Sequence, residues 1–492
     1  MKPVQWLASC RSARAVSWGV VLLAGFCFGG GALSVAGATT ASCPLPAGTV
    51  DSSFLRAPAP PWGWGVAAVA NELPDGKVMV GMFGTYSYTN GSELTEREVL
   101  VRLNKDGTLD PSFVFTSTNF YRVWQTHALA VASNGLMAVA TSGYGTEGWY
   151  HGQFHLLRPD GSVIVASESG GDDSGLVRAL AWQPDGRLVI GGNYRAFLPG
   201  LPTGVARLLP GSGAVDGSFT PPANLLFGYG LAVDRSGRIL VHTGNSLLRL
   251  LPSGAPDPTF QPASLEPFYI NTGLESMASV ALDEEGRILV SGVFTNVNGV
   301  PRARVARLHP NGALDVTFNP TTTRGDLWSY QQQLSLALQP DGKILLGGSL
   351  APFSGAPSTG LVRLHGDGSL DPSFDAGTMR SYVNSICLRR DGRVLVTTMF
   401  SLENSMSPYQ LLADPQPRLA APEFTPDGSV RLRLDSVPGA EYVLQSSMNL
   451  ATWRDEGTKR AEACTLAFTN SPVPGVGHFF RIRRPTETEL GR

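Results

Sequence analysis

The chain has 492 residues, of which 42% are hydrophobic and 16% charged, and it contains 57 glycines and 36 prolines. This composition is typical of a folded protein with many turns and excludes a disordered chain. The formal net charge is −2, from 38 basic and 40 acidic residues. Because nucleic-acid binding needs a basic surface, this balance argues against a nucleic-acid partner.

Residues 1–38 are predicted to be a secretory signal peptide. Three basic residues begin the segment, an apolar stretch runs from about residue 16 to residue 35, and residues 36–38 form an A-x-A cleavage site. A single membrane anchor is the competing interpretation, but the glycines and the cleavage site favour removal. The remaining chain has 35 basic and 40 acidic residues, a net charge of −5. We expect a secreted or cell-surface bacterial protein, with the periplasm as a further location, and no membrane attachment after cleavage.

A phrase close to P-D-G-K/R, followed by apolar residues and often by G-G, occurs seven times. Its anchoring glycines are Gly76, Gly135, Gly186, Gly237, Gly286, Gly342 and Gly392, which lie 59, 51, 51, 49, 56 and 50 residues apart. A second phrase, close to L-D-P-S-F, ends at Phe54, Phe113, Phe219, Phe260, Phe318 and Phe374. A regular period of this length is typical of a repeat architecture. The phenylalanines are predicted to be hydrophobic plugs between neighbouring repeats.

Each repeat predicts about four short strands and no helix. In residues 334–374, apolar segments alternate with a Pro-Asp-Gly turn, a variable loop and an Asp-Gly turn. One such sheet cannot bury both faces, whereas a ring of sheets can. The seventh repeat lacks the second phrase, and residues 51–54 supply one before the first repeat. The sequence therefore predicts an all-β protein with a seven-bladed β-propeller of four-stranded blades over residues 39–414, closed by the N-terminal strand.

The paired phrases "LQPDGKILLGG" and "LVRLHGDGSLDPSF" resemble the delta-60 repeat of secreted bacterial β-propellers over about residues 48–414. The resemblance implies the fold and brings no catalytic residues. Residues 415–422 are predicted to be a linker, 423–485 a small β-sandwich and 486–492 a flexible tail. Within the sandwich, the runs "YVLQSS" and "FFRIR" resemble fibronectin-III-like C-terminal modules of exported bacterial proteins.

Strand alternation predicts which face of the ring varies between repeats. The first-to-second and third-to-fourth connections are short and repetitive, so the other connections form a variable face. Those loops carry many aromatic residues, including Phe227 and Tyr229. The candidate partner-binding residues are Trp62, Trp64, Tyr86, Tyr88, Tyr121, Trp124, Trp149, Tyr150, Trp328 and Tyr330. Exposed Trp and Tyr suit a sugar or a protein partner, although many of these rings are alternatively plugs between blades. Trp182, in a predicted inner strand, is expected to be a core residue.

No catalytic or metal-binding pattern emerges, so we expect no enzyme activity, no cofactor and no metal. His151 and His155 are four residues apart but are expected on a strand and a following loop, which would not bring both to one face, while His309 and His365 are turn residues. Cys387 is expected to be a buried core residue. The protein is therefore predicted to be a monomer that binds a glycan or protein at the cell surface. The alternatives are a polysaccharide-degrading or lyase propeller, with acids such as Glu93, Glu96 and Glu98, and a structural or adhesin spacer.

Overall fold

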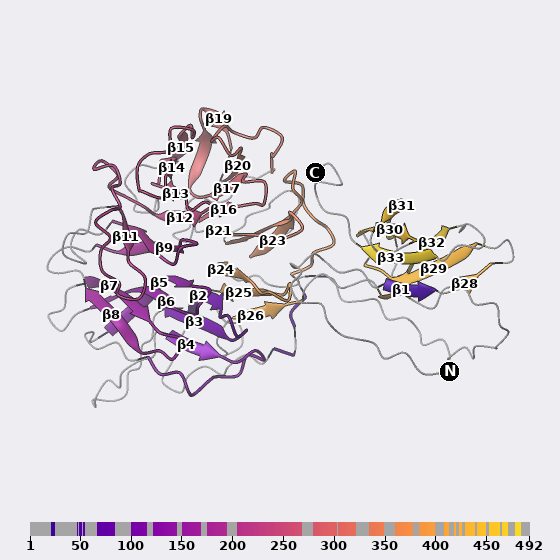
Figure 1. The fold of residues 1–492 in the computed structure, drawn as a ribbon, viewed down its shortest axis with the longest axis horizontal. Coiled ribbons are helices and arrows are strands. Elements are labelled where there is room, and N and C mark those ends of the chain that lie inside the picture. The colour runs from indigo at the N-terminus through magenta and orange to yellow at the C-terminus, as the bar shows by residue number, and fades with distance from the viewer. Residues whose placement is uncertain are drawn as a thin grey trace. The chain divides into compact units, whose positions relative to one another are not determined.

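The structure is a computed structural model, and all of the regular secondary structure among its described residues is β-strand (Figure 1). It describes residues 21–24, 47, 49–51, 53–54, 66–83, 100–115, 122–144, 150–168, 175–193, 204–267, 279–302, 304–320, 334–348, 360–376, 383–398, 408–412, 418–419, 423–425, 429–437, 440–448, 452–462, 465–470 and 478–483. Two compact units are present: a larger one of residues 48–339 and 344–413, and a smaller one with the remaining residues. No helix in the described part of the chain is long and apolar enough to span a bilayer.

Each repeat of the larger unit contributes a short antiparallel sheet. The strands are, for repeat 1, β2 (Val66–Glu72), β3 (Val78–Phe83) and β4 (Leu100–Leu103); for repeat 2, β5 (Arg122–Val131), β6 (Met137–Tyr144), β7 (Tyr150–Leu157) and β8 (Val163–Glu168); for repeat 3, β9 (Val177–Trp182), β10 (Leu188–Gly192) and β11 (Val205–Leu208); for repeat 4, β12 (Gly230–Val233), β13 (Ile239–His242) and β14 (Ser246–Leu250); for repeat 5, β16 (Ser279–Leu282), β17 (Ile288–Ser291) and β20 (Val305–Leu308); for repeat 6, β21 (Leu334–Leu338), β22 (Ile344–Gly348) and β23 (Leu361–Leu364); and for repeat 7, β24 (Val383–Leu388), β25 (Val394–Thr398) and β26 (Tyr409–Leu411).

The recurring Asp-Gly phrases form the predicted turns. In repeat 3 the amide of Gly186 donates to the carbonyl of Gln183 at 3.0 Å, and Gln183 N–H donates to the carbonyl of Arg187 at 2.8 Å. Gly186 has a φ of 84°, a conformation that glycine adopts without strain. Asp185 caps the turn by accepting the Arg187 amide at 3.0 Å. The turn is therefore encoded locally and repeats wherever the phrase does.

The fourth strand is shorter than predicted in repeats 1, 3, 4, 5 and 6. It consists of a single bridge to the third strand, as between Leu308 and Leu314. The next residue, Asp315, uses its side chain to accept the amide N–H of Thr317 at 2.9 Å, which turns the chain away from the sheet. The second repeat lacks the phrase close to L-D-P-S-F, and its fourth strand is the full strand β8.

Each of those five repeats contains an Arg–Asp–Phe cluster, which is buried apart from the half-buried Arg102 and Phe374. In repeat 5, Arg307 Nε donates to Asp315 Oδ2 at 2.7 Å, and the guanidinium lies 5.0 Å from the centre of the Phe318 ring. Arg307 Nη1 also donates to the carbonyl of Gly366 in repeat 6. The corresponding residues are Arg102, Asp110 and Phe113; Arg207, Asp216 and Phe219; Arg249, Asp257 and Phe260; and Arg363, Asp371 and Phe374.

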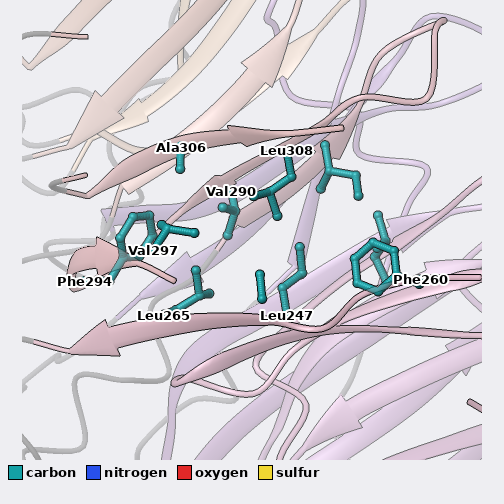
Figure 2. Packing of buried hydrophobic residues seen from close by; sticks show 11 residues of the cluster. Leu247, Phe260, Leu265, Val290, Phe294, Val297, Ala306 and Leu308 are labelled. Atoms are coloured by element: carbon teal, nitrogen blue, oxygen red, sulfur yellow. The ribbon is translucent and has the colours of Figure 1, made fainter. Parts of the chain in front are cut away.

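Hydrophobic clusters pack neighbouring repeats together. Figure 2 shows the cluster between repeats 4 and 5, in which Phe260 and Leu247 pack near Val290 and Leu308. Here β15 (Ala263–Pro267) pairs with both β14 and β18 (Phe294–Val297), and β18 forms a hairpin with β19 (Val300–Pro301). The predicted plug phenylalanines are at most 5% exposed, except Phe374, which is half-buried.

The first strands of successive repeats lie side by side in the order β2, β5, β9, β12, β16, β21 and β24, and β24 also lies beside β2 (Figure 1). Asn384 Nδ2 and Thr397 Oγ1 of repeat 7 donate to the backbone carbonyls of Ala67 and Ala68 in repeat 1, at 3.2 and 3.1 Å. Val50 forms an antiparallel bridge with Leu411 of β26. The N-terminal segment thus pairs with the last strand of the larger unit.

The smaller unit consists of two sheets that share one hydrophobic core. Its strands are β1 (Val21–Ala24), β27 (Arg418–Leu419), β28 (Glu423–Phe424), β29 (Val430–Asp435), β30 (Glu441–Ser447), β31 (Arg454–Arg460), β32 (Thr465–Asn470) and β33 (His478–Arg483). One sheet has the order β1-β33-β30-β31, and in the other β29 pairs with β27, β28 and β32. Leu432 and Phe468 from one sheet meet Tyr442 and Ile482 from the other. β1 lies within the predicted signal segment and β27 within the predicted linker.

Several single-residue predictions can be compared with the structure. Cys387 is buried, and burial raises the pKa of its thiol to about 11, which confirms a core role. His309 and His365 begin turns, as predicted. Trp182 is half-buried and packs against the hydrophobic cluster of repeats 2 and 3, and its indole N–H donates to the carbonyl of Ala130 in the neighbouring repeat at 3.2 Å.

Candidate functional site

The aromatic candidates from the sequence fall almost entirely on loops for which the structure gives no description. Trp124 lies within strand β5, and Tyr150 is the first residue of strand β7. The others lie outside the described residues: Trp62, Trp64, Tyr86, Tyr88, Tyr121, Trp149, Trp328 and Tyr330. Their role as partner-binding residues therefore stays a prediction.

A described part of the variable face borders a groove of about 510 Å³, which extends to the Arg–Asp–Phe cluster of repeat 4. The connection between repeats 3 and 4 (residues 220–229) forms one side of it. The loop between β13 and β14 (residues 243–245) and the third strand of repeat 4 form the other. This volume is within the range of small-molecule sites.

Exposed apolar side chains border the groove. Leu226 is 53% exposed and Phe227 is 42% exposed. The ring of Phe227 stacks on Tyr229 with a centroid separation of 5.5 Å and an interplanar angle of 13°. Exposed large hydrophobic side chains that gather at a concave surface indicate a binding site more strongly than scattered ones do. The sequence contained this signal, since both rings lie in a variable loop, but it did not distinguish them from the other aromatic residues.

Uncharged polar groups also line the groove. Asn224 and Asn245 are exposed, and Thr243 is half-buried. Thr243 Oγ1 donates to Asn245 Oδ1 at 3.1 Å, which orients the asparagine amide. A mainly apolar surface with a few oriented polar groups is the usual composition of a ligand pocket.

The charged residues of the groove neutralise each other at its floor. Arg249 Nε donates to Asp257 Oδ2 at 2.7 Å, and Nη2 donates to Thr259 Oγ1 at 3.1 Å. Burial would raise the pKa of Asp257, but the hydrogen bonds from Thr259 and Arg249 outweigh it and hold the pKa at about 2. This pair is one of the repeated Arg–Asp–Phe clusters, so its first role is to hold the sheet together.

Repeat 2 contains a buried Ser–His contact that resembles a catalytic dyad in distance only. His127 Nε2 lies 2.7 Å from Ser142 Oγ, and Arg178 Nη1 lies 3.3 Å from His127 Nδ1. Burial, together with the charge of Arg178, lowers the pKa of His127 to about 3, so the ring is neutral. Since arginine can only donate, Nδ1 accepts and the proton is on Nε2. In this tautomer His127 donates to Ser142 and does not activate it as a base.

The prediction that His151 and His155 do not share a face was wrong. Both lie on β7, and residues four apart on a strand point to the same side. Both are 3% exposed, and Phe115 packs edge-on to His155 with a centroid separation of 5.1 Å. Four strand residues span about 13 Å, too far for both rings to ligate one zinc ion. Among the described residues, no group of three or more His, Cys, Asp or Glu is placed to hold a metal ion.

Comparison with family models supports the fold. A model described as a "beta-propeller" domain of unknown function, DUF5122, matches residues 73–113, 183–219, 286–318 and 339–374. These segments cover the Asp-Gly turns and the Arg–Asp–Phe clusters of repeats 1, 3, 5 and 6. These four repeats therefore match a β-propeller model. A comparison with curated proteins gives no match.

Solved structures with similarity to the chain include two bacterial proteins. One is the extracellular domain of a protein described as the hybrid two-component system BT3049 from B. thetaiotaomicron (11% identity, TM-score 0.41, 85% of this chain and 53% of that chain). The other is PorZ, a surface component of the type-IX secretion system of Porphyromonas gingivalis (12% identity, TM-score 0.38, 80% of this chain and 63% of that chain). The chain thus matches less than two thirds of the length of either structure.

Proposed function

We propose that the chain is an exported protein whose repeats, of the delta-60 type, form a closed seven-bladed β-propeller. The neighbouring positions of β24 and β2 and the bridge between Val50 and Leu411 support closure. The amide of Asp51 donates to the carbonyl of Gln410 at 2.7 Å, and that of Leu412 donates to the carbonyl of Thr49 at 2.8 Å. The N-terminal segment then supplies the fourth strand of blade 7.

A rearranged version of the repeated cluster also supports closure. In blade 7 the third strand carries Gln410 at the position that arginine has in five other blades. The side-chain amide of Gln410, Nε2, donates to Asp51 Oδ2 at 2.8 Å. Arg389, from the first turn of blade 7, donates to Gln410 Oε1 and to the carbonyl of Lys105 in blade 1. In blades 3 and 6 the third-strand arginine donates to a glutamine of the first turn, Gln183 or Gln339, so blade 7 has the two residue types in exchanged positions. The contact to the next blade is retained.

We further propose that this propeller binds a glycan or protein partner at the cell surface through its variable face, without catalysis. The observation that carries the proposal is the groove at which the exposed apolar side chains of Leu226 and Phe227 gather. The C-terminal module, proposed to be fibronectin-III-like, would serve attachment or sorting. The signal-like segment 1–38 supports export, and we expect a monomer.

Binding to glycan arrays and to intact bacterial cells tests this proposal. The mature protein, residues 39–492, should be retained, and Phe227→Glu should reduce retention because it places a charge on the groove. The matched control is Val316→Glu, since Val316 is 67% exposed and belongs to repeat 5, away from the groove. Equal retention of the three proteins would contradict a role for this face, and release of new reducing ends from a polysaccharide would indicate the enzyme alternative.

A further inference from the structure

We propose that the groove between repeats 3 and 4 binds an uncharged oligosaccharide, with Phe227 as its stacking platform. This inference rests on the proposed function and specifies the chemical class of the partner and the residues that recognise it.

The charges of the groove favour a neutral ligand. Arg249 and Asp257 bind each other, and Arg249 Nη1 also donates to the carbonyl of Pro310. The second oxygen of Asp257 accepts the amide N–H and the hydroxyl of Thr259, at 2.9 and 2.7 Å. A charged ligand would have to compete with these buried bonds, which is costly. An uncharged ligand leaves them intact.

The aromatic platform suits the flat face of a sugar ring. Tyr229 stacks against Phe227 with a centroid separation of 5.5 Å, and Phe227 remains 42% exposed, so part of the residue is accessible to a ligand. The negative face of an aromatic ring attracts the polarised C–H groups on one side of a pyranose. Leu226 extends the apolar surface beside the ring.

The polar side chains are suited to sugar hydroxyls. Thr243 Oγ1 donates to Asn245 Oδ1, which leaves the Nδ2 group of Asn245 as a donor at the edge of the groove. Asn224, on the opposite loop, is exposed and supplies a second amide, with one donor group and one acceptor. Two amides in a groove with apolar lining match a ligand that has an apolar face and polar hydroxyl groups.

The walls of the groove are already ordered. The β13–β14 connection is only three residues long, and Thr243 N–H donates to the carbonyl of Ser246 at 2.9 Å. On the other side Leu225 N–H donates to the carbonyl of Pro222 at 2.9 Å. Prolines restrict both walls, at Pro222 and Pro262. A preformed groove avoids much of the entropy loss on binding.

Strand addition by a peptide is disfavoured at the same place. The edge of β14 that borders the groove is already paired with β15, through Ser246 and Ser264. A peptide would therefore find no row of free backbone groups there. A proline-rich peptide, which needs aromatic surface rather than a strand edge, remains the alternative that the experiment distinguishes.

Calorimetric titration of the mature protein with defined probes tests the inference. The probes are neutral trisaccharides to hexasaccharides of glucose, xylose, mannose and N-acetylglucosamine, an oligogalacturonate as the charged counterpart, and a proline-rich peptide. At least one neutral oligosaccharide should bind, and Phe227→Ala should weaken it about ten-fold, the loss of one aromatic stacking contact. Asn245→Ala should also weaken binding, whereas Val316→Ala, an exposed control in repeat 5, should not.

Three results would overturn the inference: no neutral oligosaccharide binds at millimolar concentration, only the charged oligosaccharide or the peptide binds, or Phe227→Ala binds the sugar as tightly as the wild type does. Phe227 is 42% exposed and stacks on Tyr229, so Phe227→Ala should melt only slightly below the wild type, and an unchanged circular dichroism spectrum excludes misfolding as the cause of lost binding. Cell binding that Phe227→Glu abolishes, without any binding to the sugars, would contradict the oligosaccharide inference and leave the proposed function standing.

Discussion

Replacement of Asp315 by alanine should destabilise the larger unit by about 3–5 kcal/mol, because it leaves a buried arginine without its counter-ion. The Asp315 carboxylate accepts hydrogen bonds from Arg307 Nε at 2.7 Å and from the amide and hydroxyl of Thr317. Burial would raise its pKa, but the bonds from Thr317 and Arg307 prevail and hold the pKa at about 2. Arg307 is 5% exposed, so bulk water is largely excluded from its guanidinium group.

Urea unfolding followed by circular dichroism measures this loss. Asp106→Ala is the matched control, because Asp106 accepts the same two bonds from Thr108 in an exposed turn but has no buried arginine partner. We expect a loss of about 1 kcal/mol there. The double variant Arg307→Met/Asp315→Leu should recover most of the stability, since it removes both buried charges. A loss for Asp315→Ala no greater than that for Asp106→Ala would refute the reasoning.

Three further predictions concern stability. Asp51→Ala removes the acceptor of the Gln410 amide and should lower the melting temperature; an unchanged value would argue against pairing of the N-terminal segment. Gly312→Ala should destabilise the protein far more than Gly211→Ala, although both glycines have a positive φ, of 92° and 77°. A Cβ atom on Gly312 would lie 2.0 Å from the carbonyl oxygen of Gln261, whereas no atom lies within 4 Å of a Cβ built on Gly211. Equal melting temperatures of the two variants would contradict this prediction. Burial is the main cause that lowers the pKa values of three histidines, to about 3 for His127 and about 4 for His155 and His242. As the pH falls, these histidines become protonated in the unfolded chain before they do so in the folded protein. The free energy of unfolding should therefore be full above pH 6.5 and fall toward pH 4, by up to about 1.4 kcal/mol per pH unit for each histidine. A urea midpoint equal at pH 7 and pH 5 would contradict the lowered pKa values.

The repeats could be predicted because their turns depend on neighbouring residues. Asp185, Gly186 and Arg187 form their turn through contacts within a few residues, and the phrase repeats along the chain. The Arg307–Asp315 pair was missed, although an arginine stands eight or nine residues before the aspartate in five repeats. In a strand where apolar and polar residues alternate, an arginine side chain is usually expected to face the solvent. Its burial follows from contact with the next repeat, which one repeat's sequence does not show.

The groove could be predicted only in part, because it depends on how two separate loops meet. The sequence places Phe227 and Tyr229 in a variable connection, and it shows that the β13–β14 loop is short. Whether the two rings stack on each other or fill a gap between sheets is decided by packing. The histidines of β7 illustrate another limit: the expected strand was assigned too short, and the number of residues in one strand decides which side chains share a face.

A disulfide between residues 50 and 411 tests closure of the ring most directly. The hydrogen bonds on either side of the Val50–Leu411 bridge make it a non-hydrogen-bonded pair, whose Cα atoms lie about 4.5 Å apart, within reach of a disulfide. Val50→Cys/Leu411→Cys, in a background with Cys43→Ser and Cys464→Ser, should form this cross-link on oxidation, as detected by mass spectrometry of unreduced peptides, and should melt at a higher temperature than its reduced form. Thiols that stay unlinked in the folded, oxidised protein would contradict closure by the N-terminal segment.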